Sequence, residues 1–392
     1  MSDTIICVAD DVGVRVWLER VLESDWNLEL VSSSDLSRVS RLVQATGAAV
    51  VIVAIDENEA SRALKVFSAV QKSCPEAHLV GVSQRISQDL LLNIMRAGAR
   101  DCLITGVDAD SARERVAKVA SVAAPARGAS SREIKSNITI VTAASAVVDT
   151  RFFGQNFVHE LSESQKDKSI LALDSGSDPN RTFYFDNLNR LTLNDLVSRG
   201  DNVDRNFVET ALEEFSPGLR LLSGQLDSKA LEGDAGADLY ITITQLASLF
   251  DHLVIRVEAG HLEGWLRALG SDVSNIMLLT HPAVDQIQSS DDIIKYASDW
   301  VSDRCRVFVV VDGFEKKSNL SLSDAEKTLG RSCDLLIPIE WRYRLDAINA
   351  GIPISLLPAK TQYEKCLRSF VRKQFIEKEK GLSSLILKRA SA

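Results

Sequence analysis

The chain has 392 residues, of which 45% are hydrophobic and 25% charged, and its formal net charge is −9 at pH 7. This balance is ordinary for a globular protein and leaves room for two domains. The net negative charge argues against a whole-protein nucleic-acid binder. Six scattered cysteines form no CxxC pair and no Cys/His cluster, so we expect free thiols in a reducing compartment and no metal site.

The two ends of the chain differ in charge. The N-terminal sequence MSDTIICVADD has acids and no basic segment, so it does not predict a signal peptide. From Lys360 to the end there are nine Lys or Arg against three Glu. No apolar run approaches the roughly 18 residues that span a bilayer. We therefore expect a cytoplasmic protein.

Residues 1–122 alternate short apolar runs with amphipathic stretches. The apolar runs predict strands at residues 5–8, 28–31, 50–55, 79–82 and 101–104. Between and after them, the periodicity predicts helices at 14–22, 36–44, 63–72, 90–97 and 110–123. Strands and helices that alternate in this way predict an α/β domain with a doubly wound parallel sheet.

This order resembles the response-regulator receiver domain, through IICVADD before a helix, VVIVAID, LVGVS and RAGARDCLITG. The resemblance implies a magnesium pocket with a phosphoacceptor Asp, a hydroxyl residue and a Lys. Here that set is partial, with Thr105 in place of the Lys: Asp10, Asp11, Asp56, Ser83 and Thr105. The acceptor position falls on Ala54 or, in a shifted register, on Asp56. The missing Lys favours a structural pseudo-receiver, and phosphorylation at Asp56 is the alternative.

Residues 123–137 are rich in Ala, Ser and Gly and predict a linker. Beyond it, residues 138–392 predict a second, mainly parallel α/β sheet. Its strands are expected at 138–141, 169–173, 218–222, 252–257, 275–280, 306–311 and 335–339. Helices are expected to begin within residues 150–161 and to follow at 193–197, 206–214, 241–250, 264–269, 291–302, 324–329, 343–350 and 363–375.

The second domain resembles the MinD/ParA branch of deviant-Walker P-loop ATPases. The phrases that carry the resemblance are LALDSGSD, FDHLVIRVEAG, NIMLLTHP and SDAEKTLGRSCDLLIPIEWRYRLDAINAGIPI. With a receiver-like domain in front, the chain resembles more narrowly the TadZ/CpaE pilus-assembly proteins. The match covers nearly the whole chain through the order and spacing of these phrases.

That family's P-loop, K-G-G-x-G-K-T-T, falls on Ala144, Ser145, Ala146, Val147, Val148, Asp149, Thr150 and Arg151. Both Lys positions are lost, to Ala144 and Asp149, and only Thr150 matches. Side chains at the glycine positions keep the backbone from phosphate, and Asp149 adds a repelling charge. The Walker B acid position carries Arg256, whereas Asp174 survives at the position that orients the attacking water.

These losses predict a pseudo-ATPase that is not an enzyme and needs no cofactor. Arg256 is expected to form a salt bridge with Asp149 or Asp174 across the degenerate nucleotide site. The alternative is weak ATP binding, with Arg151 or Arg256 as the anion ligand.

The resemblance implies a non-enzymatic localisation and assembly scaffold that recruits a tight-adherence (Flp, type IVb) pilus secretion machine to a cell pole. It implies a homodimer that contacts the pilus secretion ATPase and inner-membrane Tad components, with no nucleic-acid partner. The final segment KGLSSLILKRASA could add peripheral membrane contact. The alternative function is an ATP-binding MinD/ParA-like positioning switch with unconventional nucleotide ligands.

Overall fold

A computed structural model describes residues 4–122, 137–176, 191–199, 203, 205–212, 214–224, 226, 231, 233–317 and 320–377. The chain divides into two compact units. The first comprises Met1–Lys135, Lys229–Gln245 and Arg267–Asp272, and the second comprises Ser136–Ser228, Leu246–Leu266 and Val273–Ala392. The linker predicted at 123–137, apart from its last residue, and the tail segment KGLSSLILKRASA lie outside the described residues.

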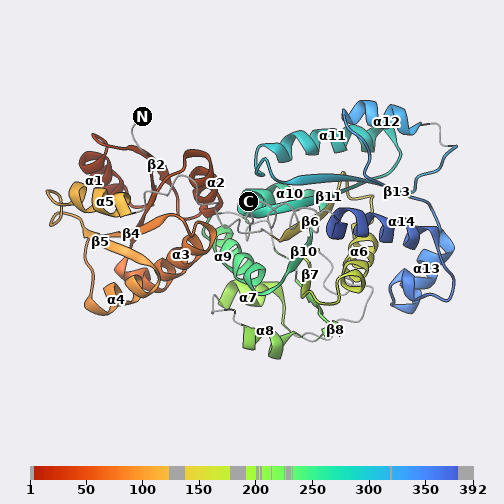
Figure 1. The fold of residues 1–392 in the computed structure, drawn as a ribbon, viewed down its shortest axis with the longest axis horizontal. Helices are drawn as coiled ribbons and strands as arrows, with labels where there is room; N and C mark the ends of the chain where they lie inside the picture. The colour runs from red at the N-terminus through yellow and green to blue at the C-terminus, as the bar shows by residue number, and fades with distance from the viewer. Residues whose placement is uncertain are drawn as a thin grey trace, which may run out of the picture. The chain divides into compact units, whose positions relative to one another are not determined.

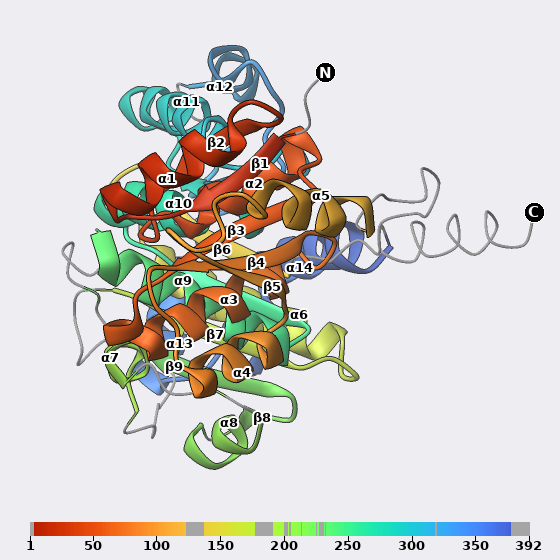
Figure 2. The same ribbon diagram turned by 90° about the vertical axis from the view of Figure 1, so that its left-hand side faces the viewer.

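The first unit (Figure 1) is built on a five-stranded parallel sheet in the order β2-β1-β3-β4-β5, in which all five strands are labelled in Figure 2. The strands are β1 (Thr4–Val8), β2 (Asn27–Val31), β3 (Val50–Ile55), β4 (His78–Ser83) and β5 (Ala99–Ile104). The helices are α1 (Val12–Leu22), α2 (Leu36–Thr46), η1 (Glu57–Glu59), α3 (Ala60–Ser73), α4 (Gln88–Arg96) and α5 (Ala112–Val122). Figure 2 shows α1 and α5 on one face of this sheet and α3 and α4 on the other.

The apolar periodicity of α1 explains how the first sheet is covered. Val14, Leu18 and Val21 recur at helical spacing and are buried against the sheet. The central strand β3 has four consecutive buried residues, as expected when both faces of a parallel strand are covered. The apolar pattern of each element therefore indicates which of its faces is buried in the doubly wound arrangement.

The second unit holds an eight-stranded sheet in the order β13-β12-β11-β6-β10-β7-β9-β8. Among the strand pairs of the described residues in this sheet, only β8–β9 is antiparallel. The strands are β6 (Ile138–Ala143), β7 (Ile170–Asp174), β8 (Glu214–Ser216), β9 (Leu219–Ser223), β10 (His252–Arg256), β11 (Val273–Thr280), β12 (Arg306–Asp312) and β13 (Leu335–Ile337).

The helices of the remaining chain lie between and after these strands in the sequence. They are α6 (Thr150–Ser164), α7 (Leu193–Arg199), α8 (Arg205–Ala211), α9 (Gly233–Leu249), η3 (Ala259–His261), α10 (Leu262–Leu269), η4 (Gly270–Asp272), α11 (Val284–Ser298), α12 (Leu322–Leu329), α13 (Trp341–Ala350), η5 (Ile354–Leu356), α14 (Gln362–Val371) and the π-helix η6 (Arg372–Glu377). Most of α9 and all of η4 belong to the first unit. Within the described ranges, none of these helices combines the length and apolar character needed to cross a membrane.

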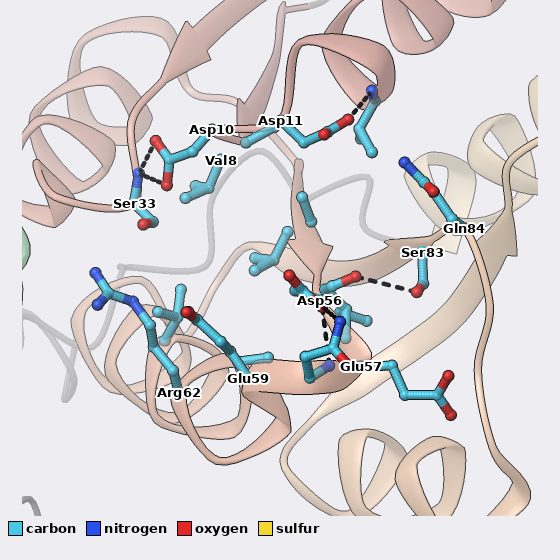
Figure 3. Close-up of a pocket in the computed structure, with 18 of the residues that line it drawn as sticks. Val8, Asp10, Asp11, Ser33, Asp56, Glu57, Glu59, Arg62, Ser83 and Gln84 are labelled. Atoms are coloured by element: carbon cyan, nitrogen blue, oxygen red, sulfur yellow. Dashed lines mark hydrogen bonds between the residues drawn. The ribbon is translucent and has the colours of Figure 1, made fainter.

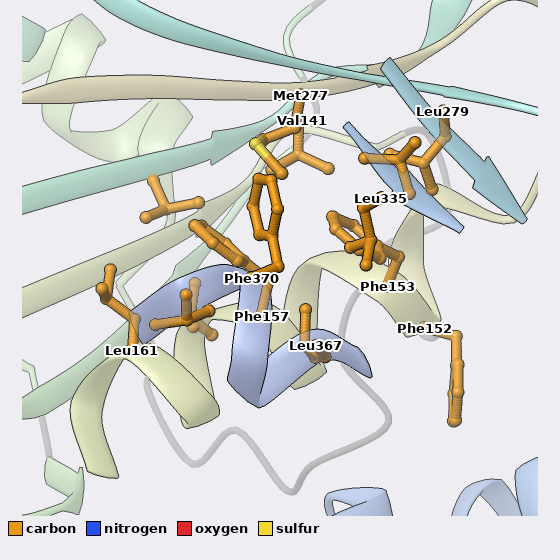
Figure 4. Close-up of a cluster of buried hydrophobic side chains, with 14 of the residues drawn as sticks. Val141, Phe152, Phe153, Phe157, Leu161, Met277, Leu279, Leu335, Leu367 and Phe370 are labelled. Atoms are coloured by element: carbon orange, nitrogen blue, oxygen red, sulfur yellow. The ribbon is translucent and has the colours of Figure 1, made fainter. Parts of the chain in front are cut away.

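Side chains of β12 alternate between two layers of helices. Phe308 and Val310 join the large cluster formed with α6 and α14, whereas Val309 packs with residues of α11 and α12. Figure 4 shows the large cluster, in which Phe153, Phe157 and Phe370 point toward the sheet. All residues of α6 from Phe152 to Ser162 are buried, so this helix is the central element of the second unit.

The predicted α/β fold class, with two mainly parallel sheets, is confirmed. The helix predicted at 206–214 ends earlier, at Ala211, and the chain then forms the short strand β8. The helix predicted at 241–250 begins at Gly233 instead, and the strand predicted at 335–339 ends at Ile337. Pro338 follows that strand directly and cannot donate a ladder hydrogen bond, which explains its early end.

Replacing Phe157 by Ala should destabilise the second unit by about 3–5 kcal/mol, because the ring is fully buried and its loss leaves a cavity. The ring lies 6.0 Å from that of Phe153 and 5.3 Å from that of Phe375, between centroids. Urea unfolding followed by tryptophan fluorescence measures the change. Leu356→Ala, at a side chain that is 56% exposed, is the control and should shift the curve by about 0.5 kcal/mol or less. Equal shifts would contradict this packing.

Candidate functional site

The loop between β6 and α6 occupies the position of a phosphate-binding loop. The amide of Ala144 donates to the carbonyl of Leu279 at 2.9 Å, which fixes the loop to β11. At the other end, Asp149 caps α6, since its Oδ1 accepts from the amides of Arg151 at 2.9 Å and Phe152 at 3.3 Å. Amides at a helix N-terminus are the groups that bind phosphate in such loops. Here a carboxylate of the chain itself accepts from them.

Arg256 lies at the centre of this site. Strands β7 and β10 are paired in register so that Asp174 and Arg256 lie side by side at the carboxyl edge of the sheet. Arg256 Nε donates to Asp174 Oδ1 at 2.6 Å, and its Nη1 donates to the hydroxyl of Thr150 at 3.2 Å. Both charged residues are buried. Of the two salt bridges considered from the sequence, the structure contains the one with Asp174.

Two further residues shape the site and were not singled out from the sequence. A Cβ atom on Gly176 would lie only 1.6 Å from Arg256 Nη2, so the absence of a side chain there gives the guanidinium its room. The carboxylate of Glu258 lies 3.8 Å from the same nitrogen. In the sequence, the glycine that follows LALDS was the feature that could have indicated this contact. Only the pairing of β7 with β10 shows that the space beside it holds the guanidinium of Arg256.

Burial dominates the acid–base behaviour of Asp174. Loss of solvent raises its pKa to about 6, although the charge of Arg256, the amide of Gly176 and the charge of Arg151 all act to lower it. Arg151 therefore acts on Asp174 electrostatically. The carboxylate bears its charge at neutral pH, and Arg256 is its counter-ion.

A second buried ion pair lies at the carboxyl end of β12. Arg344 of α13 donates two hydrogen bonds to Asp312, one of them at 2.9 Å. Burial acts against the charge of Arg344, but Asp312 and, more weakly, Asp149 raise the pKa of its guanidinium. Ser145 of the loop donates to Gln286 of α11 at 2.7 Å. Hydrogen bonds between side chains therefore link neighbouring elements along this edge of the sheet.

The side chains at this edge differ from the usual ligand set of a magnesium–nucleotide complex. An anion and its metal need free amides, a lysine and a metal-binding acid at this edge. Here Asp149 accepts from the helix amides, Arg256 replaces the acid, and the hydroxyl of Thr150 accepts from Arg256. In the parts of the chain that the structure describes, no three His, Cys, Asp or Glu side chains are grouped as metal ligands.

The predicted acidic residues of the first unit share one cavity of about 620 Å³. Its lining includes Asp10, Asp11, Asp56 and Ser83, with the alternative acceptor position Ala54 (Figure 3). Thr105 is not among the lining residues; its amide donates to the carbonyl of Ser83 at 2.9 Å. Four of the five positions named from the sequence therefore line one cavity, and Thr105 does not.

The three predicted carboxylates in that cavity each have a local partner. Asp10 accepts from the hydroxyl of Ser32 at 2.6 Å and from the amide of Ser33, while Asp11 caps α1 through Val14 at 2.7 Å. Although partial burial acts in the other direction, these serine hydrogen bonds and the charge of Arg15 lower the pKa of Asp10.

The other two predicted residues that line the cavity, Asp56 and Ser83, also form hydrogen bonds with nearby parts of the chain. Asp56 accepts from the amide of Asn58 at 2.8 Å and so caps η1. Ser83 donates to the carbonyl of Ile55 at 3.0 Å and contacts that of Arg85. Figure 3 shows Asp10 directed toward Ser33, whereas Asp11 is directed toward the start of α1. The acids therefore share a cavity without converging on one ligand position.

Comparison with solved structures defines the fold. The ParA family ATPase from Chlorobium tepidum TLS is 17% identical over 60% of this chain and 96% of that chain, with a TM-score of 0.53. The MinC:MinD cell division protein complex from Aquifex aeolicus gives 18% identity over 60% and 94%, with a TM-score of 0.50. A CheY-like protein (tadZ) from Pseudomonas aeruginosa PAO1 gives 20% identity over 30% and 98%, with a TM-score of 0.28. No protein-family model and no curated protein matches the sequence.

The class of fold follows from these comparisons and from the strand orders. The second unit has a MinD/ParA-like P-loop fold, over which the two ATPase structures align. The first unit has the strand order 2-1-3-4-5 of flavodoxin-like receiver domains. The chain therefore combines a receiver-like unit with a MinD/ParA-like unit, as its sequence predicts.

Replacing one member of the Arg256–Asp174 pair should lower the free energy of unfolding by more than replacing both members. Arg256→Leu leaves a buried carboxylate, and Asp174→Leu leaves a buried guanidinium, each at a cost of about 3–5 kcal/mol of stability. The double variant leaves no charge and should recover most of that loss. Denaturant unfolding of all four proteins measures the coupling. Strictly additive losses would show that the two side chains do not interact.

The raised pKa of Asp174 predicts a pH dependence of stability. The folded state retains the Asp174 proton up to about pH 6, whereas the unfolded state loses it near pH 3.8. Folding therefore favours the protonated form, and this contribution declines as the pH rises from about 4 to 6. Unfolding free energies measured from pH 4 to pH 7 should fall for the wild type relative to Asp174→Asn. An increase over that interval would contradict the assignment.

Proposed function

We propose that the protein is a non-enzymatic scaffold: a pseudo-ATPase whose MinD/ParA-like unit acts through its surfaces rather than through nucleotide hydrolysis. The observation that carries the proposal is the position of Arg256. Its guanidinium lies between Asp174 and the hydroxyl of Thr150, at 2.6 Å and 3.2 Å, in the place where a metal ion would require anionic and hydroxyl ligands. Because the guanidinium of Arg256 is part of the chain, it does not exchange with solvent as a metal ion does. The site therefore lacks the ligand-dependent change that a nucleotide switch requires.

The receiver-like unit supports the same proposal. Asp10, Asp11 and Asp56 cap helices or bind the loop after β2. The sequence resemblance puts Thr105 at the position of the receiver lysine. Without a cation at that position, an acyl phosphate on Asp56 would have no counter-charge from that residue. We infer that this unit is a pseudo-receiver that serves as a structural or binding module.

The biological setting that we propose is a tight-adherence (Flp, type IVb) pilus secretion system. The support is the sequence resemblance to TadZ/CpaE proteins together with the two-unit order. In this proposal the protein forms a homodimer at a cell pole and recruits the secretion ATPase and inner-membrane Tad components. In a bacterium with such a system, a fluorescent fusion should form polar foci, and pili should be lost on deletion. Diffuse fluorescence with normal pili would contradict this setting.

Titration of the purified full-length protein with MgATP should give no saturable heat in isothermal calorimetry. The expectation follows from the blocked helix amides and the internal cation Arg256. A ParA family ATPase in the same buffer is the positive control, and circular dichroism confirms that the titrated protein is folded. Binding of one ATP per chain, accompanied by nucleotide-dependent association, would instead support the alternative function, an ATP-binding positioning switch.

A further inference from the structure

Helix α13 exposes a pair of large apolar side chains. Trp341 is 61% exposed and Leu345 is 50% exposed. The two residues are four apart and so lie on the same face of the helix. Ile339, 40% exposed, lies just before the helix. A tryptophan in such a position is typical of a protein–protein contact rather than of a solvated helix face.

Trp341 is fixed in place from beneath. The guanidinium carbon of Arg344 lies 5.8 Å from the centroid of the Trp341 ring, within the range of a cation–π contact. Arg344 is itself buried and bonded to Asp312. One side of the indole therefore rests on an immobile cation while much of the ring faces solvent. A pre-oriented aromatic side chain loses little freedom on binding, which favours its use as an anchor.

Charges of both signs border the apolar pair. Arg342 and Asp346 are exposed and, like the apolar pair, are four residues apart. Across the portion of the chain that is described, neither one takes part in an ion pair or a side-chain hydrogen bond. An apolar pair bordered by one positive and one negative charge is self-complementary, because a reversed copy presents the opposite charge at each position.

We propose that α13 is a contact surface for a second copy of this chain, with the two helices antiparallel about a two-fold axis at the level of Arg344. With a rise of about 1.5 Å per residue, Arg342 and Asp346 of the second copy then lie at the same height. The ion pair forms twice, the two Leu345 side chains meet near the axis, and a Trp341 lies at each end. The inference rests on the homodimer of the proposed function and adds the surface that forms it.

The surrounding edge extends this surface beyond one helix. Val147 and Val284, at 72% and 60% exposure, follow β6 and β11 and therefore lie at the carboxyl edge of the sheet, where α13 begins after β13. They are further exposed apolar side chains on this edge, and the inference places them at the periphery of the contact. A stable dimer needs about 800 Å² from each copy, which a single helix does not supply alone.

Charge exchange tests this arrangement directly. Analytical ultracentrifugation of the full-length protein without nucleotide should show a dimer. Arg342→Asp places two acids opposite each other, and Asp346→Arg places two bases opposite each other, so each variant should weaken dimerisation by at least about tenfold. Mixing the two variants should restore association, because only the mixed pair regains both ion pairs. The double variant R342D/D346R should also dimerise on its own.

Lys327→Asp is the matched control, since it makes the same change of charge at an exposed position of α12. It should leave the dimer unchanged, and circular dichroism should be the same for every variant. A wild type that is monomeric at every concentration overturns the inference, and so does a dimer that tolerates both single charge changes or a mixture that fails to associate. The calorimetric test with MgATP is a separate readout, so failure of this surface and failure of the scaffold proposal can be told apart.

Discussion

The ion pair between Arg256 and Asp174 determines how the carboxyl edge of the second sheet is held together. A buried carboxylate at the end of β7 would be unstable without a positive partner. Arg256 provides that partner from the adjacent strand and reaches on to Thr150 at the start of α6. One side chain therefore connects two strands and the central helix. In P-loop nucleotide-binding proteins, a lysine and a magnesium ion at this position contact the bound phosphates instead.

Internal neutralisation also explains why α6 can begin where it does. The unpaired amides of a helix N-terminus need an acceptor, and Asp149 supplies it from the preceding residue. The helix is buried along almost its whole length and packs against α14. Asp149 therefore satisfies the first turn of a helix whose side chains also form much of the aromatic core.

Most of the fold was predictable because its signals are local. Strands such as β3 and β12 consist of continuous apolar runs, and α1 shows helical periodicity, so neither depends on distant residues. The partner of Arg256 was not predictable, because only the register between β7 and β10 decides between Asp149 and Asp174. Likewise, the sequence placed acids in the receiver-like cavity but did not predict that each would bind a local amide. Helix capping and ligand binding compete for the same carboxylate oxygens, and the spacing of a motif does not show which of the two occurs.

At the same edge of the sheet, a buried ion pair also supports an exposed aromatic side chain. Arg256 is bonded to Asp174 and Thr150, whereas Arg344 is bonded to Asp312 below and supports the indole of Trp341 above. An ion pair within the protein thereby fixes an aromatic group outside it. If the nucleotide no longer organises this edge, its rigidity has to come from contacts of this kind, since a loop without bound phosphate offers few others. The two buried arginines thus explain how a P-loop fold could retain an ordered carboxyl edge, and a binding surface there, without the ligand for which that edge is usually built.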